Sequence, residues 1–236
     1  MRFLRLLRSL RPTKTNKGKN MKNETMKDIR KVYKDKYNDI QRALKSYRAK
    51  WETGSEEEVL AELLFCILTP QSKAKGCWSC MVSIIEKKLL LTGNEKQILA
   101  ELKYPRFKYK KAKYFVEARD KFVKNGKANI KAFMRTFKDV YEMRDWFHKN
   151  IKGYGLKETG HFMRNVGFGE DIAILDRHIL RNLAKIGVIK SVPKSITPKL
   201  YYKIEQDMKA FAKKSKIPMA ALDLILWAKE TGEVFK

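Results

Sequence analysis

The chain has 236 residues and 44% of them are hydrophobic, enough to fill a sizeable core. Lys and Arg number 53 against 26 Asp and Glu, so the net charge is +27 and a polyanion, nucleic acid first, is the expected partner. No run approaches the roughly 18 apolar residues of a membrane span, and three cysteines exclude a disulfide scaffold and a four-cysteine metal site. A generally solvated, lysine-rich surface is the alternative explanation of the charge.

Residues 1–25 hold eight basic residues and one acid, which is +7 of the net charge and leaves +20 for the rest. An Arg-rich targeting peptide or a DNA-trailing tail has this composition. We favour a basic, disordered extension without a role, with the functional chain beginning near Met21 or Met26. Residues 26–236 are then one domain, and its sparse cysteines suit a cytoplasmic protein at the nucleoid.

From residue 26 on the pattern is helical almost throughout, and no alternating stretch predicts a strand, so the fold class is all-α. The stretch SEEEVLAELLFCILT begins with a capping box from Ser55 to Glu58, and Pro70 ends that helix. We read PQSKAKG as a loop or a short bend. Further helices are predicted at 77–90, 95–102, 109–124, 128–136, 138–150, 156–166, 177–187, 198–214 and 218–230. No long linker divides them, so two lobes with a groove for DNA must arise from helix stacking.

The stretch IKGYGLKETG, residues 151–160, interrupts this helical pattern. Gly153 and Gly155 allow a tight turn, by a positive φ or a close backbone approach, which predicts a helix–hairpin–helix over 138–167. The first amides of the second helix, at its positive dipole end, would then face outward to hold a phosphate. An ordinary turn between two core helices is the alternative.

Two charged residues near the hairpin could carry chemistry. Lys157 lies in the first turn of the second helix, where an amine beside a fixed backbone is suited to attack a sugar C1′. Asp176, in AILDRHIL, precedes a helix and can cap it; a capping carboxylate that also faces a groove could stabilise a cationic sugar. Most such aspartates only cap, and most lysines in so basic a chain are not nucleophiles.

These residues resemble the helix–hairpin–helix DNA glycosylases, whose hairpin L/I-x-G-h-G-x-K-x-A/T is followed about twenty residues later by a catalytic aspartate. The chain has I-K-G-Y-G-L-K-E-T and then L-D-R-H. The resemblance implies a two-lobed fold with DNA between the lobes, Lys157 as nucleophile and Schiff-base residue, and Asp176 as the supporting carboxylate. It implies His178 as a phosphate contact, although a surface histidine is the alternative. In the superfamily, a lysine at this position marks the bifunctional enzymes, which excise a base and also nick the DNA strand.

Within that superfamily the chain is most similar to the compact type-2 8-oxoguanine DNA glycosylase/AP lyases of archaea and some bacteria. The stretches ELLFCILT, YFVEAR, IKGYGLKETGHFMRN to AILDRHIL, and LDLILWAKETGEVFK carry the likeness. Because a C-terminal four-cysteine cluster is missing, endonuclease III is less similar. The family often has T-A-N-x-S where this chain has T-P-Q-S at 69–72, so the resemblance implies that Gln71 fills the hole left by a flipped base.

The C-terminal stretch AALDLILWA has one polar residue, Asp223, with Trp227 four positions on and therefore on the same helix face. A ring beside an acceptor-only carboxylate suits guanine, whose Watson–Crick edge offers N–H donors. The alternative is a core tryptophan and a capping aspartate. In the family this pair lines the base pocket, and the resemblance implies that the terminal lysine, Lys236, closes it and helps to distinguish 8-oxoguanine.

We therefore expect a monomeric, bifunctional glycosylase/AP lyase that acts on double-stranded DNA containing 8-oxoguanine. We expect no membrane partner. No metal performs chemistry in this mechanism, and the one ion we expect is a structural alkali ion between the hairpin and a phosphate. One alternative is a glycosylase for another oxidised base, such as an oxidised pyrimidine. The other is a non-catalytic helix–hairpin–helix DNA-binding module, which would give no reason for Lys157 and Asp176 to occur together.

Overall fold

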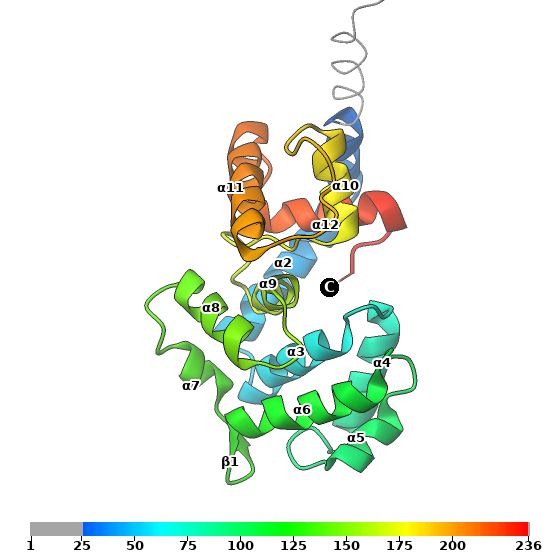
Figure 1. The fold of residues 1–236 in the computed structure, drawn as a ribbon, viewed down its shortest axis with the longest axis vertical. Helices are drawn as coiled ribbons and strands as arrows, with labels where there is room; N and C mark the ends of the chain where they lie inside the picture. The colour runs from blue at the N-terminus through cyan, green and yellow to red at the C-terminus, as the bar shows by residue number, and fades with distance from the viewer. Residues whose placement is uncertain (1–25, 236) are drawn as a thin grey trace, which may run out of the picture.

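The computed structural model describes residues 26–235, and these are almost entirely helical (Figure 1). Residues 26–35 form a helical segment that precedes α2. The helices that follow are α2 (Tyr37–Glu52), α3 (Glu56–Leu68), α4 (Ala74–Glu86), α5 (Glu95–Glu101), α6 (Lys108–Phe122), α7 (Ile130–Met134), α8 (Val140–Asn150), α9 (Leu156–Asn165), α10 (Arg177–Lys185), α11 (Pro198–Ser215) and α12 (Met219–Thr231). The all-α fold class is confirmed; the expected extension 1–25 and Lys236 lie outside the described residues.

The first lobe is built around α3, which packs against α4, α6, α7 and α9. Its capping box is present: the Glu58 amide donates to Ser55 Oγ at 3.1 Å, and the Ser55 amide donates to Glu58 Oε2 at 2.7 Å. From Val59 to Leu68 every residue is buried, because other helices surround α3 on all sides. This lobe forms the lower half of the molecule in Figure 1.

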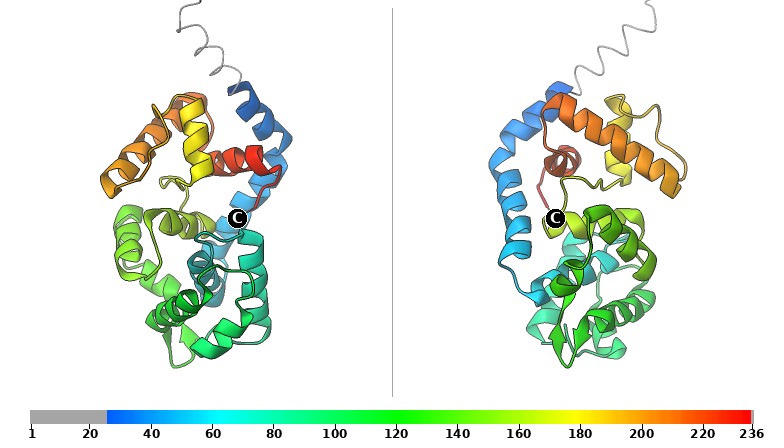
Figure 2. Two further views of the ribbon diagram at one scale, coloured as in Figure 1. Left: turned by 45° about the vertical axis from the view of Figure 1, so that its right-hand side comes forward. Right: turned by 90° about the vertical axis from the view of Figure 1, so that its left-hand side faces the viewer.

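The second lobe joins the two ends of the described chain. Helices α2, α10 and α11 pack around α12, which is buried from Met219 to Leu226. The N-terminal helices and the C-terminal helices therefore lie together, as both views of Figure 2 show. A separate hydrophobic cluster fills this lobe, so the molecule has two cores. Helix α9 contributes to both, with Phe162 in the first and Leu156 in the second.

Several predicted boundaries were wrong at the edges of the first lobe. Helix α4 begins at Ala74, so the segment read as PQSKAKG is already helical in its second half. Within it, Gly76 packs closely on Tyr104, which leaves no room for a side chain. The helices before residue 53 were not located individually, because their few buried residues, Ile29, Ile40 and Tyr47, are scattered among charged ones.

The prediction that no strand occurs was also wrong, because the structure contains a very small β-hairpin. Strands β1 (Val123–Lys124) and β2 (Lys127–Ala128) pair antiparallel, in the stretch where the sequence predicted the end of one helix and the start of another. The two turn residues, Asn125 and Gly126, have φ values of 50° and 72°. Asn-Gly with positive φ at both positions is the signal of a tight hairpin turn, and it ends α6 at Phe122.

Within residues 26–235, no helix has the length and apolar character needed to cross a membrane.

Candidate active site

The interruption at residues 151–155 is a turn that joins α8 to α9, as the sequence predicts. Gly153 has φ +85°, which favours glycine, and a Cβ there would lie 3.0 Å from the Tyr114 ring. Gly155 has φ −91° and is the N-cap of α9, so it does not need the left-handed region. Between them Tyr154 is buried and its hydroxyl donates to the Leu63 carbonyl at 2.5 Å, which attaches the hairpin to α3.

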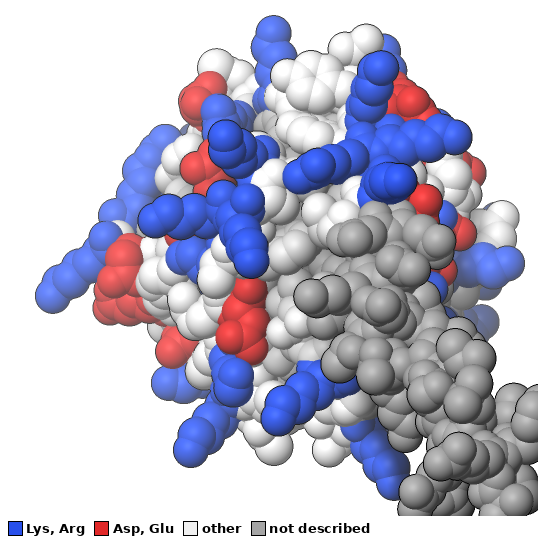
Figure 3. Space-filling model, turned by 90° about the horizontal axis from the view of Figure 1, so that it is seen from above, with Lys and Arg blue, Asp and Glu red and all other residues white. Residues whose placement is uncertain are grey.

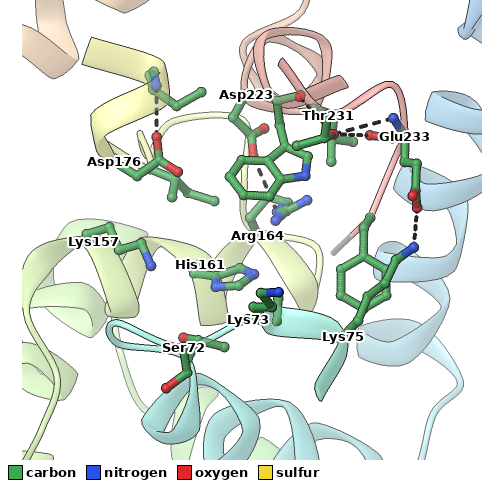
Figure 4. Close-up of a pocket in the computed structure, with 17 residues that line it drawn as sticks. Ser72, Lys73, Lys75, Lys157, His161, Arg164, Asp176, Asp223, Thr231 and Glu233 are labelled. Carbon is green, nitrogen blue, oxygen red and sulfur yellow. Dashed lines mark hydrogen bonds and ion pairs between the residues drawn. The ribbon is translucent and has the colours of Figure 1, made fainter. Parts of the chain in front are cut away.

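A cavity of about 450 Å³ opens where the two lobes meet (Figure 4). The loop before α4 contributes one side, α9 the middle, and α10, α12 and the C-terminal segment the other. Its lining residues are Thr69, Ser72, Lys73, Ala74, Lys75, Lys157, His161, Arg164, Ile174, Asp176, Ile179, Asp223, Leu224, Trp227, Thr231, Glu233 and Phe235. Catalytic and base-recognition residues predicted from separate parts of the sequence line this one cavity.

Lys157 and Asp176 line this cavity together. Lys157 projects from the first turn of α9 with 29% of its side chain exposed, and its Nζ lies 3.5 Å from Glu158 Oε1. Asp176 is the N-cap of α10: its Oδ1 accepts the Ile179 amide at 2.8 Å. Its other carboxylate oxygen accepts no hydrogen bond within the part of the chain that the structure describes. Figure 4 shows both side chains directed toward the cavity.

The predicted base-recognition residues Asp223 and Trp227 line the same cavity from α12. Burial raises the pKa of the Asp223 carboxyl, and the nearby Arg164 guanidinium opposes that rise. Arg164 Nε lies 3.7 Å from Asp223 Oδ2, while its NH1 donates to the Tyr47 hydroxyl at 3.0 Å. The carboxylate is thus held by a buried cation from α9. Lys236, the third predicted member, lies outside the described residues.

The remaining predicted residues do not line the cavity. Gln71 is exposed, at the turn between α3 and α4, with a positive φ of 54°. His178 points instead at neighbouring side chains: its ring meets Trp227 edge-on, 5.2 Å between centroids, and its Nδ1 lies 3.9 Å from Glu230 Oε2. Gly153 and Gly155 belong to the hairpin surface.

Sequence reasoning missed several residues that the cavity contains. His161 follows Lys157 by one helical turn, a spacing that could have revealed it. Arg164 follows His161 by three residues on the same face of α9, so the same spacing could have revealed it. Phe235 had no such local signal. Phe235 follows α12 yet packs against the core of the first lobe, and Lys75 of α4 pairs with Glu233 in the same segment. These contacts draw the C-terminal segment across the cavity between the lobes.

No three or more His, Cys, Asp or Glu side chains come close enough to hold a metal ion within residues 26–235. All three cysteines are free and buried, and burial raises the pKa of Cys66 and Cys77. The side chains that line the cavity include lysines, carboxylates and aromatic rings, together with His161 and Arg164. Two helical lobes, a helix–hairpin–helix between them, and a lysine and an aspartate in the intervening cavity define the class of helix–hairpin–helix DNA glycosylases.

Comparison with known proteins agrees with that class. The family model for 8-oxoguanine DNA glycosylase matches residues 40–217. The 8-oxoguanine DNA glycosylase/AP lyase of Fusobacterium nucleatum is 47% identical over 215 residues, which cover 91% of this chain and 99% of that protein. The enzyme of the same name from Methanocaldococcus jannaschii is 34% identical, over 92% of this chain and 96% of that protein.

Solved structures match as well. The M. jannaschii 8-oxoguanine glycosylase/lyase, crystallised with a 15mer DNA containing 8-oxoguanine, aligns with a TM-score of 0.79 at 33% identity, covering 89% of this chain and 99% of that one. The 8-oxoguanine DNA glycosylase of Thermotoga maritima aligns with a TM-score of 0.80 at 28% identity, covering 91% and 100%. The chain belongs to the 8-oxoguanine DNA glycosylase family.

Proposed function

We propose that this chain excises 8-oxoguanine from double-stranded DNA and then cleaves the strand on the 3′ side by β-elimination, with Lys157 as nucleophile. The observation that carries the proposal is the shared cavity: Lys157 and Asp176 line it together with Asp223 and Trp227. A non-catalytic DNA-binding module would need the hairpin but would not need these four side chains to meet. Family membership supports the same reaction, as do the relatives named 8-oxoguanine DNA glycosylase/AP lyase.

Base recognition follows from the α12 side of the cavity. A base inside a duplex is out of reach, so the damaged nucleotide must flip out into the cavity. There the ionised Asp223 accepts N–H bonds from the Watson–Crick edge, and Trp227 offers its ring for stacking. Adenine, which presents an acceptor at its ring nitrogen, matches that carboxylate less well. Lys236, next after Phe235 in the sequence, would close the cavity.

The bond changes occur on the α9 side. The Lys157 amine attacks the sugar C1′ as the glycosidic bond breaks, and the base leaves with the bonding electrons and takes up the proton that the attacking nitrogen releases. Positive charge develops on the sugar, where the Asp176 carboxylate stabilises it. Ring opening gives a Schiff base between Lys157 and C1′. Loss of the C2′ proton then expels the 3′ phosphate, and hydrolysis of the Schiff base releases Lys157.

Charge and the hairpin hold the DNA. Lys and Arg side chains stand over much of the face in Figure 3, the outer end of the second lobe, with fewer acids between them. The net charge of +27 would attract the phosphates of DNA. The N-terminal amides of α9, beyond Gly155, would bind one phosphate. An alkali ion would fit beside them, because the carbonyls of Gly153 and Tyr154 accept no hydrogen bond within residues 26–235 and carbonyl oxygens are ligands for such ions.

Two predicted contacts complete the proposal. Gln71, exposed on its turn, would enter the duplex and bond the base left opposite the flipped nucleotide. His178 would contact a phosphate from the N-terminal turn of α10, where it is part-exposed. The enzyme would work as a monomer, because both walls of the cavity come from one chain. Its DNA substrate would place it at the nucleoid.

The test is borohydride trapping on a duplex with one 8-oxoguanine opposite cytosine, comparing the native chain with Lys157→Gln. A covalent protein–DNA adduct that forms with the native chain and not with the variant is expected. Lys152→Gln is a matched control, since this exposed hairpin lysine pairs with Glu117 away from the cavity. Binding without any adduct would instead reduce Lys157 to a phosphate contact and favour the DNA-binding module. Adducts only with other lesions would overturn the choice of base.

A further inference from the structure

The segment that carries Asp176 into the cavity has no regular secondary structure of its own. Residues 172–175 are buried and lie between α9 and α10 without belonging to a helix or a strand. Buried backbone N–H and C=O groups need hydrogen-bond partners, and this segment has no helical or strand hydrogen bonds of its own to supply them. Something else must therefore fix the path of this segment, and with it the position of the Asp176 carboxylate.

Two side chains of α11, one helical turn apart, supply those partners. The Tyr201 hydroxyl donates to the Ala173 carbonyl at 2.8 Å and accepts the Leu175 amide at 3.2 Å. Glu205 Oε2 accepts the Ala173 amide at 2.7 Å. Three backbone groups of the segment are thus bound by α11, and the last of them is one residue before Asp176. Tyr201 and Glu205 are both buried, so water does not compete for these bonds.

The charge on Glu205 is balanced from the hairpin. Only 1% of the Glu205 side chain is exposed, and its Oε1 accepts from Arg144 NH1 at 2.7 Å. Arg144, which is also buried, belongs to α8, the first helix of the hairpin. A buried carboxylate is stable only with such compensation. The ion pair therefore joins the hairpin to the segment that leads to Asp176.

The opposite side of the segment touches the helix that carries Lys157. A Cβ added at Gly160 of α9 would lie 2.5 Å from the Ala173 carbonyl oxygen. Gly160 is three residues after Lys157, so it stands about one turn further along the same helix. Ala173 is consequently held between α9 on one side and Tyr201 and Glu205 on the other. This arrangement determines how far Asp176 stands from α9.

We propose that Tyr201 and Glu205, with Glu205 fixed by Arg144, are positioning residues that set the Asp176 carboxylate against Lys157 for base excision. This inference rests on the catalytic role proposed above for Asp176. The hydroxyl and the carboxylate act through the backbone of Ala173 and Leu175 and touch no substrate. A misplacement of a reacting group by about 1 Å can cost roughly 100-fold in rate. We call the contacts of Tyr201 and Glu205 with the segment the clamp. Loosening the clamp should therefore slow base excision and leave DNA binding intact.

The first test is Tyr201→Phe, which removes one hydroxyl and keeps the ring. The matched control is Tyr202→Phe, because among residues 26–235 the neighbouring hydroxyl bonds Asp145 alone, outside the cavity. We expect the single-turnover rate of 8-oxoguanine release to fall about 10- to 100-fold in Tyr201→Phe and to stay within twofold in Tyr202→Phe. The Kd for the same duplex should change less than threefold in both. Rates are measured at least 15 °C below each variant's own Tm.

A double-mutant cycle with Asp176→Asn separates positioning from general weakening, since asparagine can still cap α10. If Tyr201 acts through Asp176, adding Tyr201→Phe to Asp176→Asn lowers the residual rate less than threefold. Equal slowing in both backgrounds, or no slowing in Tyr201→Phe, would overturn the clamp. Full activity of Asp176→Asn by itself would instead overturn the catalytic role of Asp176, so the two failures are distinguishable.

Discussion

Arg164 and Asp223 form a buried ion pair in the wall of the cavity, with 3.7 Å between the guanidinium Nε and the carboxylate Oδ2. Asp223 is expected to accept N–H bonds from the base, which requires the ionised form. Burial favours the neutral form and raises the pKa of Asp223, while Arg164 acts in the opposite direction. Base recognition therefore depends on Arg164, whose pairing with Asp223 joins α9 to α12 and could not be predicted from the pattern of either helix.

Replacing Arg164 should make activity depend on a higher pH. In Arg164→Gln the pKa of Asp223 rises further, so fewer molecules carry the ionised carboxylate at a given pH. The acid limb of kcat/KM for 8-oxoguanine release should therefore move to higher pH. Arg164→Lys keeps the positive charge and should shift the acid limb less. Profiles that coincide with the native one between pH 5.5 and 8.5 would refute this role.

Removing the Phe235 ring should separate base excision from strand cleavage. Phe235 lines the cavity where a flipped base would lie, whereas an abasic site presents no base to hold. In Phe235→Ala we expect KM for the 8-oxoguanine duplex to rise about tenfold, with cleavage of a pre-formed abasic site within threefold of native. Phe137→Ala, at a part-buried ring on the first core outside the cavity, is the control. Equal losses on both substrates would contradict a base-specific role.

Lys111 should make the stability of the fold depend on alkaline pH. It is buried, its Nζ donates to the Leu68 and Pro70 carbonyls at 2.7 Å, and burial lowers its pKa to about 8 from a usual 10.5. Between these values the unfolded chain binds the proton more tightly, so the contribution of Lys111 to the unfolding free energy rises with pH. Below about pH 8 both states are protonated and that contribution is constant.

Lys111→Met removes this contribution. The native chain should therefore exceed the variant in unfolding free energy by more at pH 10 than at pH 7.5, by an additional amount on the order of 1–3 kcal/mol. Urea unfolding at the two pH values measures the difference. Lys113→Met, at an exposed position of the same helix, should show no such change. A Lys111→Met difference that is the same at both pH values would argue against the lowered pKa.

The two hairpin glycines should fail in different ways. Gly153→Ala places a side chain at φ +85° and 3.0 Å from Tyr114, so we expect the unfolding free energy to fall by about 1–3 kcal/mol. Gly155→Ala has an ordinary φ and should cost less than about 1 kcal/mol, but its methyl group would lie 2.9 Å from Glu158 Oε2 and displace the side chain that caps the start of α9 at the Gly155 amide. DNA affinity should fall in Gly155→Ala at nearly unchanged Tm. Native affinity in that variant would place the phosphate elsewhere.

Much of the fold could be predicted because its signals are local. The capping box at Ser55 and Glu58, the glycines of the hairpin and the cap at Asp176 each involve partners within a few residues. The small hairpin at Asn125 and Gly126 was missed although its signal was equally local. The helices around Ile29 and Ile40 were harder, since their burial depends on α12, which lies almost two hundred residues away.

The sequence by itself determined the hairpin, the lysine two residues after Gly155, the aspartate that caps α10, and the Asp223 and Trp227 face of α12. These follow from helical periodicity and turn geometry, which act over one or two turns. Only the tertiary structure decided that Arg164 faces Asp223 and that Phe235 of the C-terminal segment packs on the first core. It also decided that Tyr201 and Glu205 hold Ala173. Such contacts join residues 28 or more positions apart, so they exist only after both cores have packed and brought their helices together.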